Sequence, residues 1–434
     1  MTVLSIPPIR ARFGQATFPG LPVMYPVRQK FPVEEVKDVA SALTAGLNSL
    51  TEMSLIGKKI AVTAGSRGIK GIGTVLQVTV RLLQEKGAEV FIIPAMGSHG
   101  GATEEGQTEV LKNLGLTEEY LGTPIRSSKE AVSLGTTEHG LEVFCDALAY
   151  ESDGIVVCNR IKAHNVYKAE YESGLVKMLV IGLGKHRGAI AAHRLGFDRF
   201  AEVLPAATAL SLSRLPVLAG IGLIENAYGK LAGVEVLAAE EFLPREPELL
   251  RESKRIMGRL LMDKIDVLIV DEIGKEFSGG GMDANVTGRS PWGLPGFSAP
   301  SIGRIIVRDL SEATAGNAIG LGLADFTTKR CAEKIDLTTT YTNALTANSL
   351  LSPKIPVIAE NDREALSYAL HTLIGGIRQH PSIVRIRNTK DLELIQMSQV
   401  YLDHITENPD LNIVGEAQPI NFDDSGMLVS TVNK

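Results

Sequence analysis

One of the eight histidines lies in a glycine loop that could present it to a ligand. His99 stands in the loop at residues 97–103, directly after the apolar run 88–95, which predicts a buried strand. A histidine between glycines is accessible, and its imidazole can give and take a proton near neutral pH. Backbone N–H groups at the start of the following helix can also hold an anion. A solvent-exposed turn histidine is the alternative, but the position at the end of a strand favours a functional role.

A second cluster carries further nitrogen donors. It begins with the loop at residues 159–164, which ends in His164, and continues with Lys177, the run Gly182-Leu-Gly-Lys-His-Arg-Gly and then His193. Nitrogen donors suit Ni, Cu, Zn or Fe, yet no HxxxH or HExxH pair is present to fix a metal by itself. The spacing therefore leaves a metal site as one hypothesis and an ordinary charged segment as the other.

Three common site motifs are missing. The run that contains Lys185 looks like a phosphate loop, but His186 follows the lysine where a P-loop needs Ser or Thr. The loop at residues 65–71 has no GxGxxG fingerprint, and the chain has no GxSxG nucleophile elbow. Arg67 in this loop could bind a carboxylate through both prongs of its guanidinium, or it could form an ordinary salt bridge.

Alternating strands and helices must position these residues. Residues 59–64 and 88–95 predict strands, residues 73–85 predict the helix between them, and Thr103 is the expected N-cap of the helix after His99. Further strands are predicted at residues 154–158, 216–224, 265–270, 304–308 and 355–358. Repeated strand–loop–helix units predict an α/β fold with mainly parallel sheets, whose ligand loops lie at the carboxyl ends of the strands.

The length predicts more than one domain. The chain has 434 residues, and domains usually hold about 100 to 200. Hydrophobic residues make up 44% and charged residues 22%, as in an ordinary globular protein. We expect an N-terminal cofactor-binding and catalytic domain over residues 1–258, which the tail 409–434 could join, and a second α/β domain over residues 259–408. The glycine cluster at residues 278–282 and the Pro/Gly-rich residues 287–300 predict a long mobile loop.

Charge and cysteine usage exclude several classes of protein. Lys and Arg total 44 against 50 Asp and Glu, so a net charge of -6 argues against nucleic acid or an anionic membrane as partner. The three scattered cysteines exclude a disulfide framework and a CxxC metal motif, and they indicate the reducing cytoplasm. Residues 1–26 lack the apolar core of a signal peptide, and no apolar run of about 18 residues predicts a membrane span.

Four sequence segments together resemble one enzyme family. AVTAGSRG, PAMGSHGGATEEG, NRIKAH and GLVKMLVIGLGKHRGAIAAH, all within residues 57–196, are similar to segments of the nickel-pincer nucleotide-dependent lactate racemases. The resemblance implies two α/β domains around an interdomain active-site cleft. It also implies a cofactor, pyridinium-3,5-bisthiocarboxylic acid mononucleotide with nickel, which brings its own sulfur ligands and needs no cysteine site.

The resemblance assigns roles to particular residues. Lys177 matches the lysine that attaches to the cofactor, and His193 matches the protein ligand to nickel, with His186 as the rival ligand. His99 and His164 match the acid/base histidines, and Arg67 matches the arginine that binds the substrate carboxylate. We also expect Gly65, Ser66 and Lys185 to bind the cofactor.

The expected activity is that of a racemase or epimerase of a 2-hydroxy acid, by proton-coupled hydride transfer to the cofactor. The Ser-His-Gly-Gly loop differs from the His-Arg-Pro type of lactate enzymes, and cations surround the second cluster, so malate or a sugar acid is favoured over lactate. A NAD-dependent 2-hydroxy acid oxidoreductase and a non-catalytic organic-acid- or nucleotide-binding protein are the alternatives. Expected partners are the substrate and cofactor-biosynthesis proteins, with a homo-oligomer as one option.

Overall fold

The computed structural model describes residues 5–7, 20–50, 54–376 and 378–429, and the chain divides into two compact units. The N-terminal unit consists of Pro32–His164 and Lys168–Met257. The C-terminal unit consists of Met1–Phe31, Asn165–Tyr167 and Gly258–Lys434. The expectation for residues 1–26 and for the end of the tail lies partly outside the described residues.

The N-terminal unit is built on a mainly parallel sheet with strand order β3-β2-β6-β7-β8. Its strands are β2 (Lys59–Ala64), β3 (Glu89–Pro94), β6 (Gly154–Arg160), β7 (Val217–Glu225) and β8 (Leu231–Leu237). Only β8 runs antiparallel to its neighbour in this order. A separate hairpin joins β4 (Ala131–Thr136) to β5 (Glu142–Asp146). The predicted α/β class with mainly parallel sheets is confirmed.

Successive residues of a strand face opposite sides of the sheet, and in this sheet both sides are apolar and covered by helices. Ala219 and Ile221 of β7 face a core that also contains Leu47 and Leu76, from helices on one side. Gly220, between them, faces the other way, where Phe242 and Leu175 pack so closely that a Cβ on this glycine would lie within 2.7 Å of each. The strands are therefore buried on both sides.

The helices of this unit include the segments that carry the candidate residues. Their bounds are α1 (Val39–Leu50), α2 (Ile72–Glu85), α3 (Glu104–Asn113), α4 (Glu118–Leu121), α5 (Ala147–Tyr150), α6 (Leu175–Lys177), α7 (Lys185–Arg194), α8 (Phe200–Arg214) and α9 (Phe242–Ile256). A π-helical turn, Met178–Gly182, separates α6 from α7. Thr103 caps α3 by accepting the N–H of Gly106, which confirms the predicted N-cap.

The C-terminal unit has a mixed sheet with strand order β12-β11-β10-β9-β13-β14-β1-β15, and β16 also pairs with β1. The strands are β1 (Val23–Gln29), β9 (Lys264–Val270), β10 (Ser301–Val307), β11 (Phe326–Thr328), β12 (Val357–Ala359), β13 (Ile383–Ile386), β14 (Leu394–Ser398), β15 (Leu411–Ile413) and β16 (Gln418–Pro419). The helices are α10 (Ala284–Thr287), α11 (Lys329–Glu333), α12 (Leu337–Thr346), α13 (Asp362–His371) and α14 (Leu402–Glu407).

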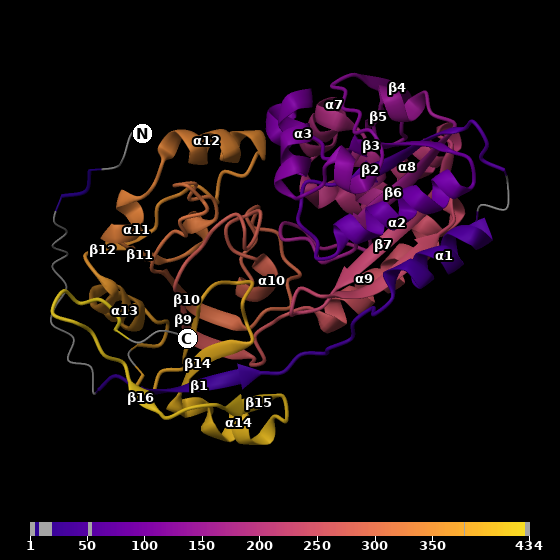
Figure 1. Cartoon of the computed structure of the whole chain (residues 1–434). Helices are drawn as coiled ribbons and strands as arrows, with labels where there is room; N and C mark the ends of the chain where they lie inside the picture. The colour runs from indigo at the N-terminus through magenta and orange to yellow at the C-terminus, as the bar shows by residue number, and fades with distance from the viewer. Residues whose placement is uncertain (1–4, 8–19, 51–53, 377, 430–434) are drawn as a thin grey trace. The chain divides into compact units, whose positions relative to one another are not determined.

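The ends of the chain differ from the predicted domain boundaries. The N-terminal unit ends at Met257, and β1 belongs to the C-terminal unit. Figure 1 shows β1, in indigo, beside β14, β15 and β16, in yellow, and β1 pairs antiparallel with all three. The described part of the tail after residue 408 therefore completes the C-terminal sheet and does not join the N-terminal unit, because β15 and β16 find their hydrogen-bond partners on β1.

The predicted mobile loop at residues 278–300 is wrong for its first part. Met282 and Ala284 are fully buried, and Asp283 caps the short helix α10 by accepting the N–H of Asn285. Apolar burial and the side-chain cap hold this glycine-rich segment in place, although its composition predicts a loop. Across the described residues, no helix combines the length and the apolar character needed to cross a membrane.

Candidate active site

The loops that follow three neighbouring strands meet at one edge of the N-terminal sheet. β2 lies between β3 and β6, and both pairings are parallel. Parallel neighbours end at the same edge, so the segments that carry Arg67, His99 and His164 leave the sheet together. This edge is where open α/β sheets bind ligands.

His99 is held in a loop of left-handed backbone. Gly97, Gly100 and Gly101 all have φ between 61° and 65°, a region that glycine enters without steric cost. The His99 ring is exposed, and its Nδ1 lies 2.8 Å from the carbonyl oxygen of Met96. A carbonyl can only accept, so Nδ1 carries the hydrogen and Nε2 carries the lone pair of the neutral ring. The structure thus presents the basic nitrogen on Nε2.

His164 is a partly buried imidazole in a strongly cationic setting. Its Nε2 lies 2.6 Å from Nζ of Lys177, and its backbone N–H donates to the carboxylate of Glu172 at 2.5 Å. Burial, followed by the charges of Lys177 and Lys168, holds the pKa of His164 well below its usual value. The ring is therefore neutral at pH 7, and Nε2 accepts the hydrogen bond from the lysine.

Lys177 is a partly buried amine whose proton is easily lost. Burial and the positive charge of Arg67 lower the pKa of Lys177 to about 8, and the negative charge of Glu172 acts in the opposite direction. A substantial fraction of this amine is neutral near pH 8, as a lysine needs to be when it acts as a nucleophile.

His193, on α7, joins the same group. The Phe197 ring has its centroid 5.1 Å from that of His193 and 6.1 Å from that of His164, so it contacts the histidines of two separate segments. Burial, with the charges of Lys177 and His99, lowers the pKa of His193 to about 4. The imidazole is neutral at pH 7 and keeps a lone pair for a ligand.

The arginine predicted to bind a carboxylate also belongs to this group. Arg67 is exposed to solvent on one side, and many protein atoms surround it on the other. Desolvation by those atoms, followed by the charge of Arg160, lowers the pKa of Arg67. Gly65 lies next to the first residue of the π-helical turn, where a Cβ on the glycine would be 3.2 Å from Met178 Cε. Ser66, which lies between Gly65 and Arg67 in the sequence, is partly buried. We call the set formed by Arg67, His99, His164, Lys177 and His193 the histidine cluster.

Two other candidate site residues do not belong to the histidine cluster. Lys185 is 1% exposed, and its ammonium contacts Gln107, the carbonyl of Pro94 and Asp146. His186, the rival nickel ligand, is exposed on the first turn of α7. The structure therefore brings together five of the predicted residues and gives Lys185 different partners.

Sequence reasoning missed the buried carboxylate of Glu172. Its two oxygens accept hydrogen bonds from Lys168 at 2.9 Å and from Lys254 at 2.7 Å, besides the one from His164. Nothing in the segment Glu170-Tyr-Glu172-Ser-Gly distinguishes the buried glutamate from an exposed one. Its burial follows from contacts with residues as distant as α9, which local sequence does not encode.

The described residues alone do not form a complete metal site. The part of the chain that the structure describes contains no group of three or more His, Cys, Asp or Glu side chains that could hold one. Cys145, Cys158 and Cys331 are free and buried. His193 could therefore give one nitrogen ligand to a metal that brings its other donors with it.

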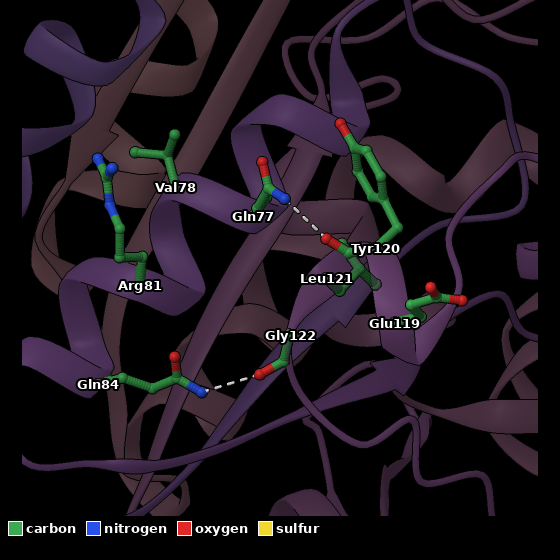
Figure 2. Close-up of a pocket in the computed structure, with 8 residues that line it drawn as sticks. All are labelled: Gln77, Val78, Arg81, Gln84, Glu119, Tyr120, Leu121 and Gly122. Carbon is green, nitrogen blue, oxygen red and sulfur yellow. Dashed lines mark hydrogen bonds between the residues drawn. The ribbon is translucent and has the colours of Figure 1, made fainter.

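A surface cavity of about 390 Å³ is lined by a different set of residues (Figure 2). It is bordered by α2 and α4, and its amide side chains are already occupied. Gln77 donates to the carbonyl of Tyr120 at 2.7 Å, and Gln84 donates to that of Gly122 at 3.1 Å. None of the residues that line this cavity belongs to the histidine cluster.

Comparison with known proteins shows what the N-terminal part of the chain resembles. Residues 23–202 match the model of the lactate racemase N-terminal domain. The lactate racemase apoprotein from Thermoanaerobacterium thermosaccharolyticum has a similar fold, with a TM-score of 0.50 at 13% identity over 79% of this chain and 90% of that one. Residues 23–202 therefore resemble the N-terminal domain of the lactate racemases.

The sequence of this chain differs strongly from those of its structural matches, at 13% and 15% identity. No curated protein matches its sequence. A structural-genomics protein from Thermotoga maritima matches with a TM-score of 0.47 at 15% identity, over 64% of this chain and 72% of that one. The family match covers all five residues of the histidine cluster, since Arg67 and His193 both fall within residues 23–202.

Proposed function

We propose that this protein is a racemase or epimerase of a 2-hydroxy acid. The observation that carries the proposal is the histidine cluster, in which His99, His164 and Arg67 follow three adjacent parallel strands and burial keeps His164 neutral. Arg67 would hold the substrate carboxylate through a two-pronged hydrogen bond. His99, through Nε2, and His164 would take the proton from the substrate hydroxyl oxygen and return it.

The residues of the cluster suit the nickel-pincer nucleotide. Lys177 offers an amine with a pKa of about 8 for attachment, and neutral His193 offers a nitrogen ligand for nickel. Gly65 and Ser66 stand beside the turn that follows Lys177, where they could contact the nucleotide. The bound cofactor would accept a hydride from the substrate carbon, a step that avoids removal of a weakly acidic C–H proton. The positive charge around Lys177 suits an anionic cofactor.

A dicarboxylate or polyhydroxylated substrate, such as malate or a sugar acid, is favoured over lactate. Lys162 supports this choice, because it lies two residues before His164 and its charge acts on that ring. Arg160 pairs with Glu225, and Arg187 stacks on Phe144 with its guanidinium carbon 4.5 Å from the ring centroid. The preference therefore depends mainly on Lys162.

Nickel analysis and mass spectrometry of protein made in a host that supplies the cofactor test the proposal. We expect nickel, a bound or Lys177-linked cofactor, and interconversion of 2-hydroxy acid enantiomers on chiral chromatography. His99→Ala and His164→Ala should lower kcat by about 100- to 10,000-fold while they keep nickel, and His193→Ala should lose it. Wild-type racemisation by both of the first two variants, or NAD-dependent oxidation without nickel, would contradict the proposal.

The remaining expectations concern the setting of the enzyme. We propose a cytoplasmic location, supported by three free, buried cysteines. Proteins that synthesise the cofactor would be needed for activation. Size-exclusion chromatography with light scattering would show whether the chain forms a homo-oligomer.

A further inference from the structure

The buried ammonium of Lys185 has no part in the chemistry proposed above. The side chain is 1% exposed, and its backbone has φ of 54°, a left-handed conformation that costs a non-glycine residue energy. A lysine is rarely buried unless its charge is compensated. The neighbours that compensate it show what this lysine does.

Two kinds of contact hold the ammonium. Asp146 supplies the counter-charge, with Oδ2 3.4 Å from Nζ, while its Oδ1 accepts the backbone N–H groups of Leu148 and Ala149. Nζ also donates to Oε1 of Gln107 at 2.5 Å and to the carbonyl of Pro94 at 3.1 Å. Pro94 is the last residue of β3, so the lysine is fixed to the strand that leads into the His99 loop.

The contact with Lys185 determines which way the Gln107 amide faces. An ammonium only donates, so it must meet the amide oxygen and not the NH₂ group. The NH₂ group then points to the His99 loop, where Nε2 donates to the carbonyl of Gly97 at 3.0 Å and to that of His99 at 3.3 Å. One buried side chain thus connects the lysine to the backbone on both sides of Ser98.

The His99 loop needs such support, because glycines give it little stiffness of its own. Gly97, Gly100 and Gly101 each have positive φ, and the unfolded chain loses more conformational freedom at glycine than at other residues. The proposed reaction needs the His99 ring within hydrogen-bond reach of one oxygen, and a displacement of about 1 Å can cost about 100-fold in rate.

We propose that Lys185 and Gln107 are positioning residues for His99, with Asp146 as the counter-ion that allows the lysine to be buried. The inference rests on the proposed function only for the step that His99 catalyses. It replaces the expectation that Lys185 binds the cofactor. The three residues act through hydrogen bonds to the loop backbone and do not touch the substrate.

Gln107→Glu is the most selective variant for the test. The glutamate side chain has nearly the same shape and still accepts from Lys185, but it places an oxygen opposite the two loop carbonyls that now receive N–H groups. Lys185→Met removes the ammonium, and Lys185→Arg restores a buried cation. Arg187→Met is the matched control, because it removes an exposed cation two residues further along α7.

Two measurements separate this inference from the proposed function. The first is the ¹⁵N spectrum of the His99 ring in cofactor-free, histidine-labelled protein, assigned with His99→Gln, which reports the tautomer whether or not the protein is a racemase. The second compares kcat, KM, nickel content and the Lys177 adduct in cofactor-loaded protein.

We expect Gln107→Glu and Lys185→Met to change the His99 spectrum and to lower kcat by about 10- to 100-fold, with KM and cofactor content unchanged. Lys185→Arg should recover part of the loss, and Arg187→Met should behave as wild type. An unchanged His99 spectrum in folded Gln107→Glu would overturn the inference, even if Lys185→Met fails to fold. Loss of cofactor from Lys185→Met with an unaltered spectrum would also overturn it, in favour of direct cofactor binding.

Discussion

Glu172 is a buried carboxylate that affects the charge of the histidine cluster. It is fully buried, and it accepts from Lys168, from Lys254 and from the backbone N–H of His164. Buried charges are tolerated when they are paired in this way. Its carboxylate also opposes the effects of burial and of Arg67 on the pKa of Lys177. One glutamate therefore fixes a histidine backbone and tunes a lysine.

Glu172→Gln should lower the pKa of Lys177 below its present value of about 8. Removal of the negative charge leaves burial and the charge of Arg67 to favour the neutral amine. The fraction of neutral Lys177 at pH 7 should therefore rise. The rate at which a small acylating reagent modifies Lys177 in the cofactor-free protein, followed against pH by mass spectrometry, measures the shift. Glu170→Gln, at an exposed neighbouring position, should leave the pH profile unchanged.

The sequence located the cluster better than it located the residues that support it. Arg67, His99 and His164 could be selected because each follows a predicted strand, and parallel strands end at one edge. Lys185 looked like a ligand because glycines flank it, yet it is buried. Whether a charged side chain is buried depends on partners far away in the sequence, as with Lys185 and Gln107, and no local pattern reports this.

At the scale of elements, the π-helical turn between α6 and α7 determines where Lys177 and His193 lie. They are 193 − 177 = 16 positions apart. In an uninterrupted α-helix they would stand about 160° apart around the axis and about 24 Å apart along it. The π-helical turn Met178–Gly182 interrupts that helix, and the charge of Lys177 acts on His193 in the folded protein. Sequence periodicity alone gave no sign of this interruption.

Gly182→Ala should disturb this turn and the His99 loop together. A Cβ at this position would lie 2.3 Å from Met178 Sδ and 2.9 Å from the carbonyl oxygen of Ala95, and the Gly182 carbonyl accepts the N–H of Gly97. We expect a loss of about 1–3 kcal/mol in the free energy of unfolding, measured by urea denaturation. Gly233→Ala in β8, where the nearest contact would be an ordinary 3.4 Å, is the control. Equal losses in both variants would contradict the prediction.

Glu246 places a buried carboxyl at the start of α6. One of its oxygens accepts the N–H of Val176 at 2.9 Å, and burial nonetheless raises its pKa to about 7. The native state thus holds this proton more tightly than the unfolded chain, where the pKa is near 4.5. This group therefore makes the free energy of unfolding fall as the pH rises from 4.5 to 7, by about 3 kcal/mol in total.

Glu246→Gln should remove that pH dependence. The amide oxygen can still accept from Val176 and carries no charge, so the variant should be more stable than the wild type by up to about 3 kcal/mol above pH 7 and similar to it near pH 4.5. Denaturant unfolding at several pH values measures the difference between the two proteins. Glu248→Gln, at an exposed position on the same helix, should show no such trend.

At the scale of the whole molecule, a buried ionic network holds the tail on the C-terminal unit. Asp362, at the start of α13, accepts from Arg308 at 2.6 Å and from the backbone N–H of Leu428 at 2.8 Å. Arg308 also contacts Asp271 at 2.7 Å, and Asp271 binds Arg385 through both carboxylate oxygens. The network therefore links the ends of β9, β10 and β13 to the last described residues.

Asp362→Ala should destabilise the C-terminal unit by about 3–5 kcal/mol, because it leaves the Arg308 guanidinium buried with one partner fewer. The loss should appear as a lower midpoint in urea denaturation. Limited proteolysis should cut the tail after residue 420 faster in the variant, since the Leu428 contact is gone. Asp424→Ala, at an exposed position in the same tail, should show neither effect.

Sequence patterns located the parallel strands of the N-terminal sheet, but in the C-terminal sheet they missed the parallel strands β11 and β13 as well as antiparallel ones. β2, β3, β6, β7, β9 and β10 coincide with predicted apolar runs, since strands buried on both faces are apolar throughout. β1 and β14 were missed. Residues 23–29 alternate weakly and contain Pro26, and their partner β14 lies about 370 positions later, beyond the reach of local periodicity.

The pairing of β1 also determines when the second sheet can be completed during synthesis. β1 leaves the ribosome before the N-terminal unit, but its partners β14, β15 and β16 are made after every residue of that unit. That unit can fold while the chain is still growing, as N-terminal domains generally do. β1 then stays unpaired until those three strands have been made. Synthesis of β14, β15 and β16, and not emergence of the N-terminal unit, therefore completes the second sheet, and separate expression of the two sequence halves would leave that sheet without an inner strand.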